Sequence, residues 1–297
     1  MRRFALGALL ALVAAACADD GADPTTTAPN PPPVTTTPTT TSPVTTSPVT
    51  TSTIDIPGAV QGTVEAVLDG DSLIITIAGT EQEVRLLGVN APERDECRGD
   101  EARDALSAFV EGEPVLVVPG ERDQFDRLLG TVYLGGADVA LDLLAGGDAI
   151  ALTVDHPDRL AYIQAEQEAF IEARGIWDRT ACGAGTETTR VYVEFLEADP
   201  PGEDLDGERI TLGNDGDAMD LSGWVVRDES SANRYRIPDG TVLEPGEILT
   251  IWTGCGTDTL SMLFWCADQP VWNNGGDTAF LLDPNGNIVN YYRYLGD

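Results

Sequence analysis

Short segments in which apolar and polar residues alternate recur along the chain from residue 58 onward, each bounded by Gly, Pro or Asp. Alternation with a period of two is typical of half-buried strands. In the first part of this region the pattern predicts five strands, at 63–67, 72–77, 83–87, 115–118 and 129–134. Turn-forming residues lie between the first three of these strands, which predicts short connections there.

Three further segments have the period of an amphipathic helix, at 99–111, 138–145 and 158–174. The residues expected on the buried side of the first helix are Ala102, Leu106, Phe109 and Val110. The residues that fall on one line of the third helix are Leu160, Ile163, Gln167, Phe170 and Arg174. Five strands with a helix inserted after the third predict a mainly β fold, a small five-stranded Greek-key barrel of the OB type with about three helices.

The chain from about residue 189 to 294 has a different pattern, in which short apolar runs alternate with turn clusters such as GNDGD, EPG and DPNGN. Turn signals at intervals of roughly 8–12 residues are typical of a β-sandwich. The patterns therefore divide the folded region into a barrel domain at 58–183 and a sandwich domain at 184–297. Residues 18–57, rich in Thr and Pro, are predicted to be a disordered linker.

Residues 1–17 have the pattern of a signal peptide, in which two arginines precede an apolar run that is too short to span a membrane. The run ends in Ala14-Ala15-Ala16-Cys17, which resembles a bacterial lipobox, and an ordinary signal peptidase site is the alternative. We therefore expect an exported protein, anchored by lipid at Cys17 to the outer face of the cell membrane or otherwise secreted.

Four cysteines remain after Cys17, an even number, as a disulfide framework in an exported chain requires. They allow three pairings, of which the domain division favours Cys97 with Cys182 and Cys255 with Cys266. A metal site built from all four is not expected, because the paired C-x-x-C spacing is missing.

The charge is strongly negative, with 50 acidic residues against 17 basic ones, all of them arginine, and a formal net charge of −33. Such a field repels nucleic acid at long range, so a site for a polyanion has to be local. The single histidine excludes a mechanism that uses two imidazoles. Carboxylate, amide, arginine and an oxygen-bound cation are left for phosphodiester chemistry.

Five runs occur in order between residues 64 and 177: VLDGDSLIITI, VRLLGVNAPE, GDEARDALSAFV, DQFDRLLGTVYL and ARGIW. Together they resemble the staphylococcal nuclease (thermonuclease)-like family. The resemblance implies cleavage of DNA or RNA with Ca2+ as cofactor. It further implies that Asp71 and Asn90 are ligands of the cation and that Ala91 contributes its backbone carbonyl. We expect the chain to be a monomer.

The same resemblance gives Glu93 the role of positioning or activating the attacking water, and gives Arg85 and Arg127 the role of gripping the phosphate. Taken singly, the residues also allow a plain turn at 69–71, an ion pair of Arg85 with Glu93, or an ion pair of Arg127 with a nearby aspartate. Asn90 stands where the family has an aspartate, which is expected to weaken calcium binding.

The C-terminal runs, among them DLSGW at 220–224, resemble the lamin-tail domain, which implies an Ig-like sandwich with Trp224 in its core. Cell-surface polymer and nucleic acid are the candidate ligands of this domain. The residues alone are also compatible with two other functions. One is a weak or inactive OB-fold lipoprotein that binds a polyanion or a partner, and the other is a surface adhesion or structural protein that acts through the sandwich.

Overall fold

The computed structural model of the chain describes residues 55–185 and 189–296. The predicted signal peptide, Cys17 and most of the predicted linker therefore lie outside the described residues. Within the described ranges, no helix is both long and apolar enough to cross a membrane. The barrel domain and the sandwich domain both belong to the compact unit formed by residues 52–297.

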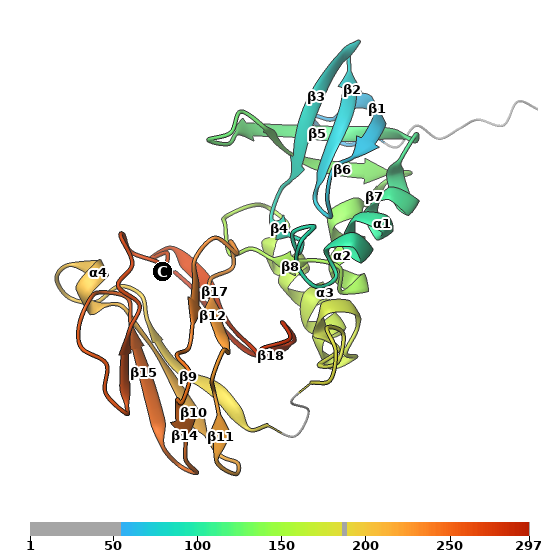
Figure 1. Cartoon of the computed structure of the whole chain (residues 1–297). Coiled ribbons are helices and arrows are strands. Elements are labelled where there is room, and N and C mark those ends of the chain that lie inside the picture. The colour runs from blue at the N-terminus through green and yellow to red at the C-terminus, as the bar shows by residue number, and fades with distance from the viewer. Residues whose placement is uncertain (1–54, 186–188, 297) are drawn as a thin grey trace, which may run out of the picture. The chain divides into compact units, whose positions relative to one another are not determined.

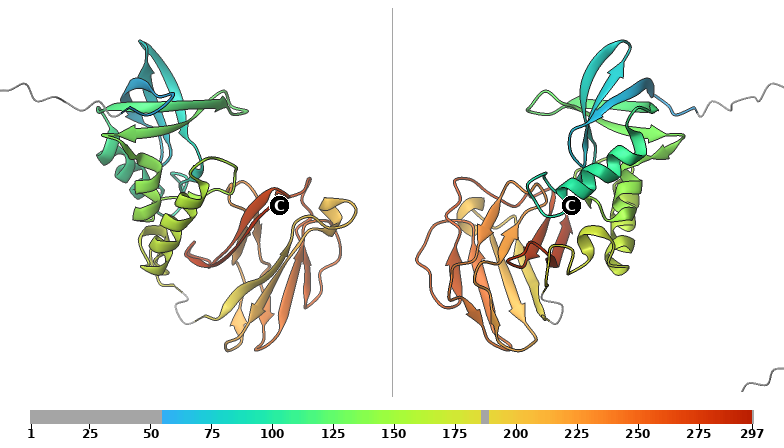
Figure 2. Two further views of the ribbon diagram at one scale, coloured as in Figure 1. Left: turned by 180° about the vertical axis from the view of Figure 1, so that it is seen from behind. Right: turned by 45° about the vertical axis from the view of Figure 1, so that its right-hand side comes forward.

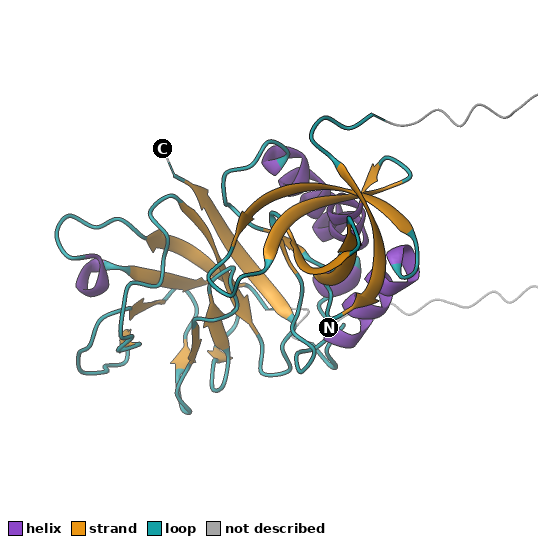
Figure 3. Cartoon of the chain, turned by 90° about the horizontal axis from the view of Figure 1, so that it is seen from above, coloured by secondary structure: helices purple, strands orange, loops and turns teal. Residues whose placement is uncertain are grey.

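Five strands form the barrel of the first domain: β1 (Val60–Val67), β2 (Ser72–Ile77), β3 (Thr80–Leu86), β5 (Pro114–Arg122) and β6 (Leu128–Leu134). They pair in the order β3-β2-β1-β5-β6, and a parallel pairing of β3 with β6 closes the ring (Figure 3). The closed five-stranded barrel that the sequence predicts is thus confirmed. Its interior is filled by the inward residues of each strand, such as Leu73, Ile75 and Val84, as strand alternation requires.

Helices α1 (Gly99–Val110), α2 (Val139–Gly146) and α3 (Arg159–Ile171) gather at one end of the barrel (Figure 2). The three predicted helices are therefore present, and a short 3-10 helix at Gly175–Trp177 follows α3. Phe109, which was expected on the buried side of α1, is 44 % exposed, and Leu160, the first residue of the line on α3, is 70 % exposed. The inner side of α3 carries Tyr162, Glu166 and Ala169.

Two short strands, β4 (Val89–Asn90) and β8 (Ile150–Ala151), pair with each other outside the barrel sheet, and neither was predicted. A further short strand, β7 (Ala137–Asp138), extends the barrel sheet beyond β6. The β4–β8 ladder joins the loop that follows β3 to the segment that precedes α3. It therefore holds Asn90 opposite Ile150.

The second domain is a sandwich of two four-stranded sheets with the orders β16-β15-β10-β9 and β13-β12-β17-β18, plus a β11–β14 pair (Figure 1). Its strands are β9 (Val191–Glu197), β10 (Arg209–Asn214), β11 (Met219–Asp220), β12 (Val225–Arg227), β13 (Arg234–Arg236), β14 (Val242–Leu243), β15 (Ile248–Trp252), β16 (Met262–Phe264), β17 (Gly276–Leu282) and β18 (Ile288–Leu295). One short helix, α4 (Asp204–Gly207), precedes β10. Trp224 is fully buried in the sandwich core, as predicted.

The barrel domain and the sandwich domain share a hydrophobic cluster. Its buried members are Ile150, Ala169, Ile176 and Trp177 from the first domain, and Phe280, Leu282 and Ile288 from the second. Both predicted disulfides are present, Cys97–Cys182 and Cys255–Cys266. The first of them ties the loop before α1 to the chain end of the barrel domain, close to this cluster.

Candidate nuclease site

Asp71 is held in the interior by the turn between β1 and β2. Gly70 makes this possible, because a Cβ on Gly70 would lie only 2.5 Å from the Cβ of Ala91 and 2.8 Å from that of Ala102. The Asp71 Oδ2 accepts a hydrogen bond from the backbone N–H of Ala91 at 2.7 Å, and Ser72 Oγ donates to Oδ1 at 3.1 Å. Burial raises the pKa of Asp71 to about 7, although the neighbouring Arg85 opposes the shift.

Arg85 spans the space between Asp71 and the loop after β3. Its Nη2 lies 2.9 Å from Asp71 Oδ2 and donates to Asn90 Oδ1 at 2.8 Å. Its Nη1 donates to the backbone carbonyls of Leu86 at 3.1 Å and Val89 at 2.8 Å. The structure therefore pairs Arg85 with Asp71 and not with Glu93, which had been the alternative. Because a guanidinium only donates hydrogen bonds, these contacts fix its plane.

Asn90 is buried, and both ends of its amide are engaged. Arg85 can only donate, so the atom that faces it must be the amide oxygen. The Nδ2 of Asn90 then points to the second domain, where it donates to the backbone carbonyl of Glu229 at 3.1 Å and to Ser231 Oγ at 3.2 Å. A side chain of the barrel domain is thus partly held by the sandwich domain.

Arg127 and Arg85 line the same cavity, which has a volume of about 370 Å3. We call it the arginine cavity. Its other lining residues are Leu86, Leu87, Gly88, Asp123, Leu129, Leu152, Val154 and Asp155. Arg127 Nε donates to Asp123 Oδ2 at 2.8 Å, so the predicted ion pair with a nearby aspartate is present as well. The Arg127 guanidinium also lies 5.4 Å from the ring centroid of Phe125. Phe125 belongs to the loop between β5 and β6 and is 70 % exposed.

Of the predicted site residues, Arg85 and Arg127 line the arginine cavity, whereas Asp71, Asn90, Ala91 and Glu93 do not. Within the described residues, Glu93 also has no hydrogen bond or ion pair with Arg85. It is exposed, and its backbone N–H donates to Glu96 Oε2 at 3.1 Å. The loop is tightly folded here, because a Cβ on Gly99 would lie 1.8 Å from the carbonyl oxygen of Glu93. The structure brings together Asp71, Arg85, Asn90 and Ala91 through direct contacts. Arg85 joins this group to the cavity that Arg127 also lines, and Glu93 belongs neither to the group nor to the cavity lining.

Oxygen donors around Asp71 fit the chemistry of a hard cation, since a carboxylate, an amide oxygen and a backbone carbonyl are ligands that Ca2+ accepts. In the described ranges, however, no cluster of three or more His, Cys, Asp or Glu side chains is arranged for a metal. The guanidinium of Arg85 bridges the oxygens of Asp71 and Asn90. The residues that would hold a cation are thus Asp71, Asn90 and Ala91, with Arg85 supplying the positive charge in the present arrangement.

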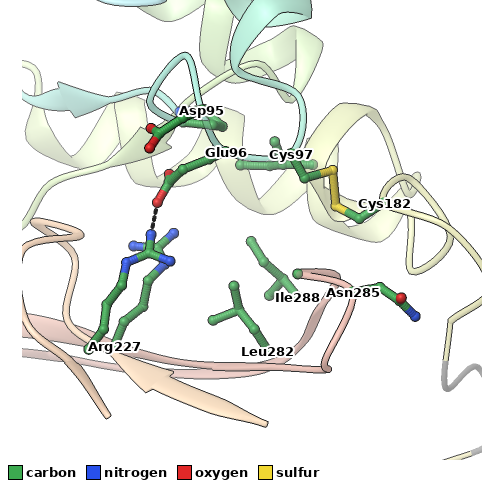
Figure 4. A pocket seen from close by; sticks show the side chains of 12 residues that line it. Asp95, Glu96, Cys97, Cys182, Arg227, Leu282, Asn285 and Ile288 are labelled. Carbon is green, nitrogen blue, oxygen red and sulfur yellow. Dashed lines mark hydrogen bonds and ion pairs between the residues drawn. A yellow bond between two sulfur atoms is a disulfide. The ribbon is translucent and has the colours of Figure 1, made fainter. Parts of the chain in front are cut away.

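A second cavity, of about 410 Å3, lies beside the loop at 92–97 and also receives residues of the sandwich domain. Figure 4 shows the Glu96 carboxylate paired with an arginine at one side of the cavity and the Cys97–Cys182 disulfide at the other. Glu96 forms an ion pair with Arg234. This cavity contains neither Arg85 nor Arg127, so the predicted phosphate contacts belong to the first cavity.

Sequence reasoning missed the residues of the second domain that reach the site. Glu229 is buried, and its carboxylate accepts hydrogen bonds from the backbone N–H of Thr153 at 3.0 Å and from Thr153 Oγ1 at 2.9 Å. Thr153 follows β8 and lies next to Leu152, which lines the arginine cavity. The pairing of Glu229 with Thr153 leaves no local signal, because the two residues lie 76 positions apart.

The barrel with its arginine cavity defines the class of the protein, an OB-fold domain of the nuclease type joined to an Ig-like sandwich. Comparison with known proteins agrees with the class. Residues 83–179 match the family described as staphylococcal nuclease homologue, and residues 185–296 match the lamin tail domain. The chain therefore contains a staphylococcal nuclease-like domain followed by a lamin-tail domain.

Named relatives cover part of the chain. A protein of Escherichia coli O157:H7 named "Uncharacterized endonuclease" is 29 % identical over 119 residues, which are 40 % of this chain and 77 % of that protein. A Haemophilus influenzae protein of the same name is 29 % identical over 115 residues, 38 % of this chain and 64 % of that protein. A Shigella flexneri protein named "Micrococcal nuclease" is 34 % identical over 73 residues, 25 % of this chain and 42 % of that protein.

Proposed function

We propose that this chain is a nuclease that hydrolyses phosphodiester bonds of DNA or RNA in the cavity between Arg85 and Arg127. The observation that carries the proposal is that both arginines line one cavity, where Asp71 and Asn90 orient Arg85. The matches to the nuclease family and to proteins named endonuclease support the same activity.

The chemistry follows from what these side chains can donate. A phosphodiester gains negative charge when water attacks it, and two arginines that line one cavity would offset that charge. Arg127 contacts Asp123 through Nε, which leaves the Nη side of its fork to face a phosphate. We propose that Glu93 orients the attacking water, and its place on the outside of the cavity requires substrate or loop movement to bring it close. A bound Ca2+ would add positive charge beside the attacked phosphate.

The test is cleavage of labelled single-stranded DNA and RNA by the full chain, with Ca2+ or with chelator. Arg127→Gln is expected to lower kcat/KM by about a hundredfold, in the range found for the loss of one charge-stabilising donor. Arg103→Gln is the matched control, because Arg103 lies on α1 and contacts Asp104 at 3.1 Å, outside the cavity. Equal cleavage by the Arg127 variant and the control would contradict the proposed site.

A second candidate function is binding without cleavage. The exposed position of Glu93 outside the cavity favours it, because the carboxylate predicted to orient the attacking water is then absent from the cavity lining. The same assay decides between the two. Wild-type chain that binds the oligonucleotide but leaves it intact with Ca2+, Mg2+ and Mn2+ would support the binding module.

We also propose that the chain is exported and lipid-anchored at Cys17, on the sequence pattern of residues 1–17. Expression in a bacterium with labelled palmitate tests the anchor. The label is expected in the wild-type chain and not in Cys17→Ser. Release of the wild-type chain into the medium without label would support the alternative of a secreted protein.

A further inference from the structure

We infer that Glu229 and Ser231, in the turn between β12 and β13 of the lamin-tail domain (residues 228–233), are positioning residues of the nuclease site. Through Glu229 and Ser231 this turn sets the orientation of Asn90, and through Asn90 it sets the orientation of Arg85. The inference rests on the proposed nuclease function, and it gives the lamin-tail domain a role within that same site.

The first step is the direction of the Asn90 amide. Its oxygen accepts from Arg85 at 2.8 Å, and its Nδ2 donates to Glu229 O and Ser231 Oγ. Asn90 is 7 % exposed, so water cannot readily replace these partners. Both ends of the amide are therefore needed, one for the barrel domain and one for the lamin-tail domain.

The second step is the residue type at position 90. An aspartate would place a carboxylate oxygen about 3 Å from the carbonyl of Glu229, so that two acceptors would face each other without a proton. A buried acceptor without a donor costs about 1–3 kcal/mol, and more when it is charged. Docking of the lamin-tail domain thus favours an amide at a position where the family has an acid.

The third step is that the turn also contacts the chain directly after β8, the second strand of the β4–β8 ladder. Glu229 contacts Asn90 with its backbone carbonyl and Thr153 with its carboxylate, so one residue spans both sides of the β4–β8 ladder. Thr278 Oγ1 donates to the same carboxylate at 3.2 Å. Leu152 and Val154, on either side of Thr153, line the arginine cavity. The turn therefore supports two walls of the site.

The turn itself is held in one conformation. Arg227 is buried and donates through Nη1 to the carbonyl of Asp228 at 2.9 Å and to Ser231 Oγ at 3.1 Å. Ser231 has φ of 65°, a left-handed conformation that non-glycine residues rarely adopt. The Ser231 hydroxyl thus receives Arg227 from one side and Asn90 from the other, which fixes its position relative to the nuclease site.

The experiment compares two neighbouring serines of this turn in the full chain. Ser231→Ala removes the acceptor for Asn90, and Ser231→Gly removes the same hydroxyl while tolerating the positive φ. Ser230→Ala is the matched control, because the Ser230 hydroxyl donates to Asp228 Oδ2 at 2.7 Å within the turn and has no contact with Asn90. Asn90→Asp tests the residue type directly.

Two readouts are used, one independent of activity. Backbone hydrogen exchange of the peptide covering residues 86–94 is expected to be about two- to tenfold faster in both Ser231 variants than in wild type, the effect of one lost hydrogen bond. The kcat for single-stranded DNA is expected to fall by about the same factor. Asn90→Asp is expected to lose more than about tenfold in kcat. Ser230→Ala is expected to match wild type in both.

The outcomes separate the two proposals. If wild type cleaves nothing, the nuclease proposal fails, and the exchange measurement still decides whether the turn positions Asn90. If wild type cleaves but both Ser231 variants equal Ser230→Ala in exchange and in kcat, the positioning role is wrong. A higher kcat in Asn90→Asp would also overturn it, because the site would then prefer a second carboxylate.

Discussion

Arg293 and Glu166 form an ion pair between the two domains whose removal is expected to be costly. Glu166, on the inner side of α3, is fully buried, and Arg293 on β18 is exposed by only 10 % of its side chain. Arg293 also donates to Thr278 Oγ1 at 2.9 Å and to the carbonyl of Ala151 at 3.0 Å. Glu166 accepts from the N–H of Ala151 at 3.0 Å. Arg293→Met therefore leaves a buried carboxylate with one neutral donor.

Breaking a buried pair by removing one partner costs about 3–5 kcal/mol. For a folded unit of this size, 1 kcal/mol shifts Tm by about 2–4 °C, so Arg293→Met is expected to lower Tm by about 6–20 °C. Differential scanning calorimetry of the full chain measures the shift. The double variant Glu166→Gln with Arg293→Met is expected to recover much of the loss, because no unpaired charge is then buried.

Asp155→Asn is the matched control for this measurement. It breaks the pair of Asp155 with Arg159, which is 3.7 Å long and whose carboxylate is 96 % exposed. Exposed pairs contribute about 0–1 kcal/mol, so a shift of no more than a few degrees is expected. If Arg293→Met behaves like this control, or if the double variant is no better than the single one, the reasoning from buried charge is refuted.

Three further predictions concern the site and the pH dependence. Arg127→Lys is expected to lower kcat/KM for single-stranded DNA nearly as much as Arg127→Gln does, because an ammonium group cannot offer the planar fork of a guanidinium. Phe125→Ala is expected to weaken binding of single-stranded DNA by about fivefold or more, because an exposed ring can stack on a base and such stacking contributes about 1–3 kcal/mol of binding free energy. Fluorescence anisotropy with a chelator present, so that the DNA stays uncut, measures the dissociation constant. Burial and the nearby Glu229 raise the pKa of Asp277 to about 7. Because the pKa of Asp277 is higher in the folded than in the unfolded state, the free energy of unfolding is expected to fall by up to about 4 kcal/mol as pH rises from about 4 to about 7. Urea titrations at several pH values measure this fall, which is expected to be smaller in Asp277→Asn.

The barrel was predictable from sequence because strand alternation reports directly on burial. Helix faces were harder, as α3 illustrates. The line through Leu160 begins with apolar residues, yet Leu160 is exposed and the charged Glu166 is buried. The reason is that the partner of Glu166, Arg293, lies 127 residues further along the chain. A periodic pattern identifies a helix, but it cannot identify a buried charge whose partner lies on another domain.

The site was predictable to a similar extent. The resemblance brought Asp71, Arg85 and Asn90 together, and they are in contact in the structure. It also placed Glu93 with them, whereas this carboxylate lies outside the arginine cavity. The contacts of Asn90 with Ser231 were not predictable, because a turn of one domain that contacts a loop of another has no spacing that reveals it.

The chain of hydrogen bonds from the site to the lamin-tail domain also bears on how an acidic protein can hold a phosphate. Arg85 donates to Asn90, Asn90 donates to Ser231, and Arg227 donates to the same hydroxyl. Arg85 and Arg227 are thus linked through Asn90 and Ser231, because Asn90 accepts a hydrogen bond from Arg85 and Ser231 accepts one from Arg227. Because the net charge of −33 repels polyanions at long range, attraction must come from fixed local charges of this kind. Salt screens the long-range repulsion between the acidic surface and a polyanion more than it screens the short-range contacts with the arginines held at the cavity. The cleavage rate is therefore expected to rise with moderate salt.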